Sequence, residues 1–260
     1  MKKYFKHIFI IMFTIFSFYY TDKVIELSDY NNTILVAIDD YAKNFDRKCI
    51  EGSINEEGII LGYSGISIDK NMSYSNMKGI GFKKELLEYK KDKCILNKDD
   101  NKDKYIISSN KYSNNIALII DIINLKYYED MIKIANNENV VINLLVNNNN
   151  YDNLIYKDNI LLKTNNNIIK EFKKKNSNFY CVKYNSFDVI KYCEKEGINS
   201  ILIKNYIDSN LLLNIKNNLD KGELYFIKES SYNLNELSTT IKYIKSRGYN
   251  IISVDELLKI

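Results

Sequence analysis

The centre of the chain carries an apolar, β-branched run that ends in a carboxylate, Ile116-Ala117-Leu118-Ile119-Ile120-Asp121. A short run of this kind, bounded by polar residues, is typical of a buried strand. We expect the strand to end at Asp121. A charged side chain then stands at its carboxyl end.

Comparable apolar runs follow at intervals of 19 to 26 residues, measured from start to start. They are Val140–Val146, Ile160–Leu162, Phe179–Val182, Ser200–Ile203, Glu223–Ile227 and Tyr249–Val254. Between them lie stretches with helical period, at Tyr127–Asn137, Ile168–Lys175, Phe187–Glu196, Leu211–Leu219 and Leu234–Ser246. Strands that alternate with helices predict an α/β domain with a parallel sheet and covering helices. Seven such units predict an incomplete (β/α)7-type barrel over residues 111–260, and an open doubly wound sheet also fits.

The region before residue 111 has a different composition. Six of the nine glycines lie between Gly52 and Gly81, and none lies between Phe82 and Glu196. Short β-rich runs occur at Thr33–Ile38, Gly58–Leu61 and Tyr105–Ser108. Strand-like runs separated by glycine-containing turns predict a small β-rich N-terminal domain over residues 21–110.

Residues 1–20 have the features of a targeting segment. Lys2, Lys3 and Lys6 are followed by the apolar run Ile8–Phe18. The run is short for a membrane span, which needs ~20 residues. No small-residue cleavage site follows it, so a signal peptide and an uncleaved N-terminal membrane anchor both remain open. Either reading predicts an extracytoplasmic protein that is membrane-anchored or secreted.

Composition excludes several functional classes. The 37 basic and 33 acidic residues give a net charge of only +4, which does not indicate a nucleic-acid partner. The only histidine is His7, inside the N-terminal segment. The rest of the chain therefore has no histidine for a zinc site or for a Ser-His-Asp triad.

Four cysteines, Cys49, Cys94, Cys181 and Cys193, would lie in an oxidising compartment if the chain is exported. None of them forms a CxxC pair, which argues against a zinc ribbon or a thioredoxin-like site. Cys181 belongs to a predicted strand, and Cys193 belongs to the helix that returns over it. A Cys181–Cys193 disulfide is one expectation, and two small buried side chains are the other.

The C-terminal 150 residues resemble the polysaccharide deacetylase family, also known as the NodB-homology domain or carbohydrate esterase family 4. The resemblance rests on the strand that ends at Asp121, on the next strand with its Asn143–Val146 ending, and on the final segment. That segment, residues 241–258, runs from a helix through Gly248-Tyr249 into a strand and a short helix. The resemblance implies a barrel fold and a role in the cell envelope.

The family's chemistry, as the resemblance implies it, uses a divalent metal such as zinc. One aspartate and two histidines hold the metal, and a second aspartate acts as the general base. Asp121 matches the base, but Ile122 stands at the metal-binding aspartate. The histidine positions carry Lys163, Thr164, Asn165 and Asn166, and the position of the general acid carries Lys228. We therefore expect no metal and no other cofactor, with Asp121 as the remnant of the base.

The ends of the predicted strands carry charged residues in place of the metal centre: Asp121, Lys183, Lys204, Lys228 and Glu229. Because the loops after parallel strands share one end of a barrel, we expect these side chains to surround one depression. They would form an ion-pair network or bind an anionic glycan substituent. If Lys228 reaches Asp121, it occupies the room left by the metal and the general acid.

The sequence thus predicts a deacetylase-like protein of the cell envelope without catalytic activity, with a cell-wall glycan as its partner or with a scaffolding role. One alternative is an active peptidoglycan or chitin-type deacetylase with a non-standard metal site. A second alternative is a purely structural or interaction module. The sequence does not specify the glycan or the oligomeric state.

Overall fold

The computed structural model describes residues 2–92, 96–163, 168–176, 178–183 and 188–259. The chain forms two compact units. The first unit contains Met1–Lys48 and Gly65–Lys93, and the second contains Cys49–Ser64 and Cys94–Ile260. Along the sequence, the chain therefore passes from the first unit to the second after Lys48, returns to the first after Ser64, and enters the second again after Lys93.

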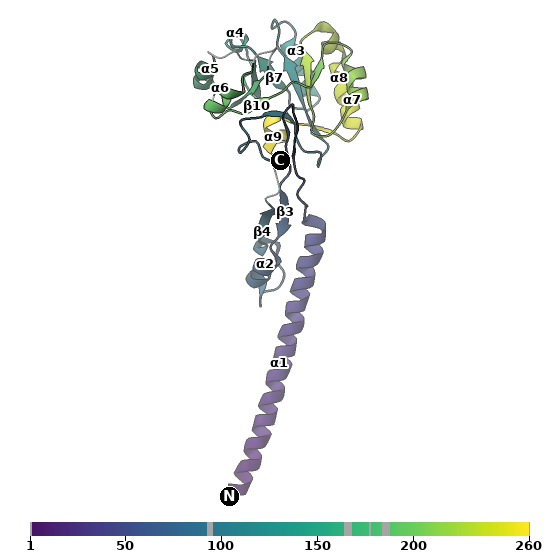
Figure 1. Cartoon of the computed structure of the whole chain (residues 1–260). Coiled ribbons are helices and arrows are strands. Elements are labelled where there is room, and N and C mark those ends of the chain that lie inside the picture. Colours follow the sequence, from purple (N-terminus) through teal and green to yellow (C-terminus); the bar gives the residue numbers. More distant parts are fainter. Residues whose placement is uncertain (1, 93–95, 164–167, 177, 184–187, 260) are drawn as a thin grey trace. The chain divides into compact units, whose positions relative to one another are not determined.

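The first unit is built on one long helix, α1 (Lys2–Phe45), shown in Figure 1. Its other elements are β3 (Gly65–Ile68), α2 (Lys70–Met77), a short 3-10 helix (Lys84–Leu86) and β4 (Tyr89–Asp92), which pairs antiparallel with β3. The core of this unit combines one face of α1 with residues of the small elements: Ile34, Ile38, Ala42, Ile68, Met77 and Leu87.

The predicted strand at Thr33–Ile38 is wrong, because this segment lies within α1. A short apolar run with β-branched residues fits a strand and a buried helix face equally well. Ile34, Ile38 and Ala42 are spaced by four residues, so a helix places them on one face, and all three are buried. The unit is accordingly a long helix with a two-stranded sheet, and not a β-rich domain.

Helix α1 is long and apolar enough to cross a membrane between His7 and Phe45, by length and composition alone, and it is the one such helix in the part of the chain that the structure describes. The large apolar side chains from Ile8 to Leu27 are exposed. The helix continues without interruption beyond the apolar run at Ile8–Phe18.

The second unit contains a large sheet with the order β1-β2-β5-β10-β9-β8-β7-β6-β12-β11, and β13 pairs with the start of β6. All of its pairings are parallel except β1 with β2. The strands are β1 (Ser53–Ile54), β2 (Ile59–Ile60), β5 (Tyr105–Ser108), β6 (Asn115–Asp121), β7 (Asn143–Val146), β8 (Ile160–Lys163), β9 (Phe179–Val182), β10 (Ser200–Ile201), β11 (Asn205–Ile207), β12 (Leu224–Lys228) and β13 (Asn250–Ile251).

Helices cover this sheet and complete its core (Figure 1). They are α3 (Tyr128–Asn137), α4 (Asn148–Tyr151), α5 (Ile169–Lys175), α6 (Ile190–Lys195), α7 (Leu211–Asn218), α8 (Ser231–Ser246) and α9 (Val254–Lys259). Alternate residues of each strand enter two separate layers. On β6, Ile116, Leu118 and Ile120 pack with α3, α7 and α8, whereas Ala117 and Ile119 share a cluster with α9.

This alternation of strands and helices confirms the predicted incomplete barrel. The predicted strands and helices of residues 111–260 are all present, with bounds shifted by a few residues. One strand is additional, β11, which extends the sheet beyond β12. Its three residues are too few to give a strand signal.

The domain boundary predicted at residue 110 differs from the division in the structure. β2 and β5 were expected in a separate N-terminal domain, but β5 pairs with β10 of the large sheet and β2 pairs with β5. Pairing between strands that are almost one hundred residues apart leaves no trace in local composition. The second unit therefore includes residues that precede the predicted barrel.

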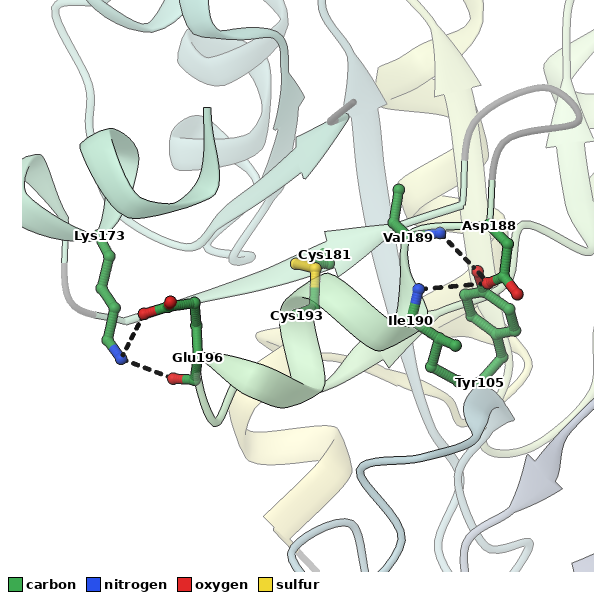
Figure 2. Close-up of a disulfide and its surroundings, with 8 residues drawn as sticks. All are labelled: Tyr105, Lys173, Cys181, Asp188, Val189, Ile190, Cys193 and Glu196. Atoms are coloured by element: carbon green, nitrogen blue, oxygen red, sulfur yellow. Dashed lines mark hydrogen bonds and ion pairs between the residues drawn. A yellow bond between two sulfur atoms is a disulfide. The ribbon is translucent and has the colours of Figure 1, made fainter. Parts of the chain in front are cut away.

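Cys181 on β9 and Cys193 on α6 are joined by a disulfide, with 6.4 Å between their Cα atoms. Figure 2 shows it between the strand and the returning helix, together with the Tyr105 hydroxyl, which bonds to the Asp188 carboxylate and accepts the Val189 N–H at 3.1 Å. Both sulfurs belong to fully buried residues. The bond therefore fastens α6 to the sheet from within the core.

Candidate functional site: the mouth of the barrel

The carboxyl ends of the strands carry the candidate site. Asp121 is the last residue of β6, and strand alternation places it on the same face as Ala117 and Ile119, which is the face that looks into the barrel. Asp121 is only 2% exposed. A carboxylate at this depth needs partners, because burial without them is costly.

Two side chains from other strands supply those partners. The Lys163 ammonium, at the end of β8, forms an ion pair with Asp121 Oδ1. The Tyr206 hydroxyl, on β11, donates to Asp121 Oδ2 at 2.9 Å. The side chain of Lys163 is 9% exposed, so this ion pair is nearly dry. Both carboxylate oxygens are thus engaged by side chains that converge across the mouth.

The pKa of Asp121 lies above its ordinary value. Burial is the largest cause of the increase, whereas Lys163 and the hydrogen bond from Tyr206 lower the pKa, and the nearby charge of Glu229 raises it slightly. Removal from water therefore outweighs the two partners. Loss of either partner would make the carboxylate still easier to protonate.

A pocket of about 400 Å³ opens beside this ion pair. Its polar side chains are Asp121, Lys163, Lys183 and Tyr206, and its apolar side chains are Ile123, Leu202 and Ile203. Tyr206 is 43% exposed, so part of its ring is available to a ligand. The pocket thus combines an aromatic face, apolar walls and one more ammonium than carboxylate.

Glu229 was expected to face this depression, but its carboxylate instead binds the backbone of the loop after β6. It accepts four backbone N–H groups of the loop after β6: Ile123 at 2.8 Å, Asn124 at 2.9 Å, Leu125 at 3.2 Å and Tyr127 at 2.7 Å. Burial raises the pKa of Glu229, but the four donors outweigh burial, so the pKa is lowered overall. Glu229 therefore fixes the loop that carries Ile123.

The three lysines that were expected at one depression lie in three different places. Lys183 lines the pocket, with its ammonium 5.2 Å from the centre of the Tyr105 ring. Lys204 lines a different pocket of about 190 Å³ with Asn205, and Lys228 pairs with Asp208 at 2.5 Å. Lys228 therefore pairs with Asp208 and not with Asp121, and the prediction of a single shared depression is wrong. The ammonium at Asp121 belongs to Lys163.

Sequence reasoning also missed Tyr206, because it lies on the strand that has no sequence signal. Lys163 was noted only as a replacement at a histidine position. The other residues noted at the histidine positions, Thr164, Asn165 and Asn166, lie outside the described residues. The signal that could have identified Lys163 is strand alternation, since it shares the face of Leu161, which packs inside the barrel.

The residues around Asp121 do not fit a divalent metal. Ile122, at the position of the metal-binding aspartate, is 1% exposed and packs in the core. The group that faces Asp121 is a cation, and a protonated amine cannot donate electrons to a metal. Among the residues that the structure describes, no group of three or more His, Cys, Asp or Glu side chains could hold a metal ion.

Comparison with known proteins gives a fold-level match. No family model matches the chain, and no curated protein matches it. Among solved structures, a pseudoenzyme of carbohydrate esterase family 4 from Bacillus anthracis is 17% identical, with a TM-score of 0.64 over 86% of this chain and 94% of that one. A mutant of that pseudoenzyme, described as having restored enzymatic activity, is 18% identical with a TM-score of 0.63, over 86% and 97% of the two chains.

Another solved structure of the family is also similar. PdaA of Bacillus subtilis, a family 4 carbohydrate esterase, is 16% identical, with a TM-score of 0.51 over 62% of this chain and 86% of that one. The pseudoenzyme match covers a larger share of this chain than the PdaA match does. The chain therefore has the NodB-like fold of family 4 carbohydrate esterases, with an ion pair of Lys163 and Asp121 at the mouth of its barrel.

Proposed function

We propose that this protein is a deacetylase-like protein of the cell envelope that binds a cell-wall glycan without hydrolysing it. The observation that carries the proposal is the ion pair between Lys163 and Asp121. It places a fixed ammonium against Asp121, the residue that matches the general base in the resemblance to the family. Because both Asp121 oxygens are engaged, the carboxylate is not poised to accept a proton from water.

The pocket beside the ion pair supports glycan binding. Pyranose rings present an apolar face and a rim of hydroxyl groups, and aromatic side chains bury such faces well. Tyr206 offers part of its ring, and Ile123 and Leu202 supply apolar contact. The ammonium of Lys183 can donate to a sugar hydroxyl or to an acidic substituent.

Helix α1 supports a membrane anchor, with the second unit and the part of the first unit that follows the span outside the cytoplasm. Lys2, Lys3 and Lys6 precede the apolar residues, and positive charge favours the cytoplasmic side of a span. The likeness of the fold to a peptidoglycan N-acetylglucosamine deacetylase, with a TM-score of 0.50, agrees with this location. The disulfide at Cys181 and Cys193 agrees with an oxidising compartment.

The test uses the full chain in lipid nanodiscs with oligosaccharides of N-acetylglucosamine and with peptidoglycan fragments. Calorimetry should detect binding without any release of acetate. Tyr206→Ala should weaken binding about tenfold, because it removes an aromatic contact. The matched control is Tyr232→Ala on α8, where the side chain is 73% exposed and does not line the pocket, and it should leave binding unchanged.

Two results would overturn the proposal. Acetate release that disappears in Asp121→Asn, together with stoichiometric zinc in the untagged protein, would show an active deacetylase with a non-standard site. Absence of binding to every fragment would favour a purely structural module.

A further inference from the structure

Lys183 carries the positive charge of the mouth pocket that no neighbouring carboxylate neutralises. It follows directly after β9, and its backbone N–H donates to the Ile201 carbonyl at 3.0 Å, which holds it at the carboxyl end of the barrel strands. Its ammonium lies 5.2 Å from the centre of the buried Tyr105 ring, and an aromatic face holds a cation in place without removing its charge. In the part of the chain that the structure describes, no carboxylate forms an ion pair with Lys183.

The other two charged side chains of the pocket neutralise each other. Asp121 and Lys163 form the buried ion pair, and the Tyr206 hydroxyl donates to the same carboxylate. Glu229 acts on Asp121 through its charge, but its carboxylate is held by four backbone N–H groups of the loop after β6. Among the described residues, a ligand in the pocket therefore meets the charge of Lys183 and no unpaired carboxylate.

Asp188 is the acidic residue that acts on Lys183 from outside the pocket. The hydrogen bond from Tyr105 is the largest cause that lowers the pKa of Asp188, and the charge of Lys183 is a smaller one. The Asp188 carboxylate accepts the Tyr105 hydroxyl and the Ile190 N–H, the latter at 3.2 Å (Figure 2). Asp188 does not line the pocket. It therefore reduces the charge of Lys183 from a distance and leaves the ammonium available to an anion in the pocket.

The segments that follow Lys163 and Lys183 add no negative charge. Residues 164–167 are Thr-Asn-Asn-Asn, and residues 184–187 are Tyr-Asn-Ser-Phe. Neither segment contains Asp or Glu. The excess of positive charge at the pocket is therefore a property of the sequence around it as well as of the described side chains.

The donors of the pocket fit a carboxylate better than a phosphate. Phosphate sites usually combine an arginine fork or a helix N-terminus with several donors. Arg47 and Arg247 are the only arginines of the chain, and neither lines the pocket. The Lys163 ammonium and the Tyr206 hydroxyl are engaged by Asp121. The one remaining ammonium among the described lining residues suits a compact group with a single negative charge.

The pocket is large enough for a sugar residue and not only for an ion. Its volume of about 400 Å³ lies within the range of ~300–1,000 Å³ that is typical of small-ligand sites. We infer that it selects a sugar that carries a carboxylate, with the sugar ring against Tyr206 and the carboxylate on the Lys183 ammonium. This inference rests on the proposed function, because it names the class of glycan that the same site binds. The carboxylate can belong to the lactyl ether of a muramic acid or to the oxidised terminal carbon of a uronic acid.

The test compares acidic and neutral sugars in two matched pairs, by calorimetry on the full chain in lipid nanodiscs. One pair is N-acetylmuramic acid and N-acetylglucosamine, and the other is glucuronic acid and glucose, each as the terminal residue of the same trisaccharide. The acidic member should bind about tenfold more tightly, because a charge-assisted hydrogen bond is stronger than one to a neutral hydroxyl. The pair with the larger preference identifies the source of the carboxylate.

Substitutions assign the preference to one side chain. Lys183→Met should reduce the ratio of the two affinities from about tenfold to near equality, whereas Lys183→Arg should keep the preference because it keeps the charge. The matched control is Lys216→Met. The Lys216 ammonium also lies over a tyrosine, 5.5 Å from the centre of the Tyr243 ring, but it does not line the pocket. This control should leave the ratio of the affinities unchanged.

The outcomes separate this inference from the proposed function. Equal affinity for both members of each pair in the unmodified protein would overturn the inference and leave glycan binding intact. A preference that survives Lys183→Met would overturn it as well, and so would tighter binding of a glycerol phosphate oligomer than of either acidic sugar. Absence of binding to every sugar would instead overturn the proposed function.

Discussion

Asp121 and Glu229 are buried carboxylates at the ends of adjacent strands, and they are held in opposite ways. β6 and β12 are paired, and the Glu229 N–H donates to the Asp121 carbonyl at 3.0 Å. Glu229 is held by four backbone donors and its pKa is lowered. Asp121 is held by two side chains, and burial keeps its pKa raised.

The difference indicates that Glu229 has a structural role, whereas Asp121 is part of the candidate site. Backbone donors remain whichever residues occupy the loop, so Glu229 keeps its environment as long as the loop keeps its shape. The partners of Asp121, in contrast, are the side chains of Lys163 and Tyr206, which substitutions can remove one at a time. Substitution of neighbouring side chains can therefore change the environment of Asp121, whereas the environment of Glu229 depends on the shape of the loop.

The largest effect is expected from Lys163→Met. This variant leaves the buried Asp121 charge without its cation, which should reduce the free energy of unfolding at pH 7 by ~3–5 kcal/mol. Urea denaturation measures this change in the free energy of unfolding. Asp121→Asn combined with Lys163→Met should recover much of the loss, because no buried charge then remains.

The matched control is Lys175→Met, whose pair with Asp152 is exposed on both sides. Its loss should stay below ~1 kcal/mol. If Lys163→Met were as mild as Lys175→Met, the ion pair at the mouth would not be the structural replacement that we describe.

A smaller loss of stability is expected from Glu229→Gln. The amide keeps one acceptor oxygen but turns its NH₂ group toward a backbone donor, which should cost ~2–3 kcal/mol. Hydrogen exchange should accelerate at the amides of Ile123, Asn124, Leu125 and Tyr127. The control is Glu236→Gln, where the carboxylate accepts one backbone N–H, from Leu212 at 2.9 Å. Unchanged exchange at the four amides would contradict the assigned role.

The two carboxylates should also give opposite dependence on pH. The pKa of Glu229 is lowered in the folded state, so its contribution is present above the unfolded value of ~4.3 and is lost as pH falls through the folded pKa. The pKa of Asp121 is raised, so its contribution is present below the unfolded value of ~3.9 and is lost as pH rises through the folded pKa.

Denaturation of Glu229→Gln and Asp121→Asn over a pH series tests this difference. Relative to the unmodified protein, Glu229→Gln should lose less stability on acidification, and Asp121→Asn should lose less on the approach to neutral pH. Each slope can change by up to ~1.4 kcal/mol per pH unit. Slopes that change in the same direction in both variants would show that the two environments are alike.

An element of this fold could be predicted from the sequence when its pattern lies in contiguous residues, but not when it depends on pairing with a distant strand. The strand that ends at Asp121 was predicted because its apolar residues are contiguous. β11 was not predicted, since its three residues gain their strand geometry from pairing with β12. β5 was assigned to the wrong domain for a similar reason, because its partner β10 lies far away in the sequence.

The site was predicted in part, and the error at Lys228 and Glu229 has a physical explanation. Consecutive residues point to opposite faces, so Glu229 leaves the inner face that Leu224 and Phe226 share. Lys228 lies on that inner face, in register with Asp121 on the paired strand, but its ammonium pairs with Asp208 instead. The same rule places Lys163 on the inner face with Asp121. Tyr206 could not be placed at all, because its strand was not predicted.

The smallest effect is expected from Tyr206→Phe, which removes only the hydroxyl that donates to Asp121 Oδ2 at 2.9 Å. The loss should be ~1 kcal/mol, the usual value of one hydrogen bond. The pKa of Asp121 should rise further, because this hydrogen bond favours the charged form, and carbon-13 NMR titration of the carboxyl group measures that rise. Glycan binding should persist, since the ring remains, whereas Tyr206→Ala should weaken it about tenfold. Tyr232→Phe, at an exposed position, is the control for loss of a hydroxyl. A loss as large as that of Lys163→Met would mean that the hydroxyl, and not the ammonium, holds the carboxylate, and the contrast with Glu229 would then rest on Tyr206.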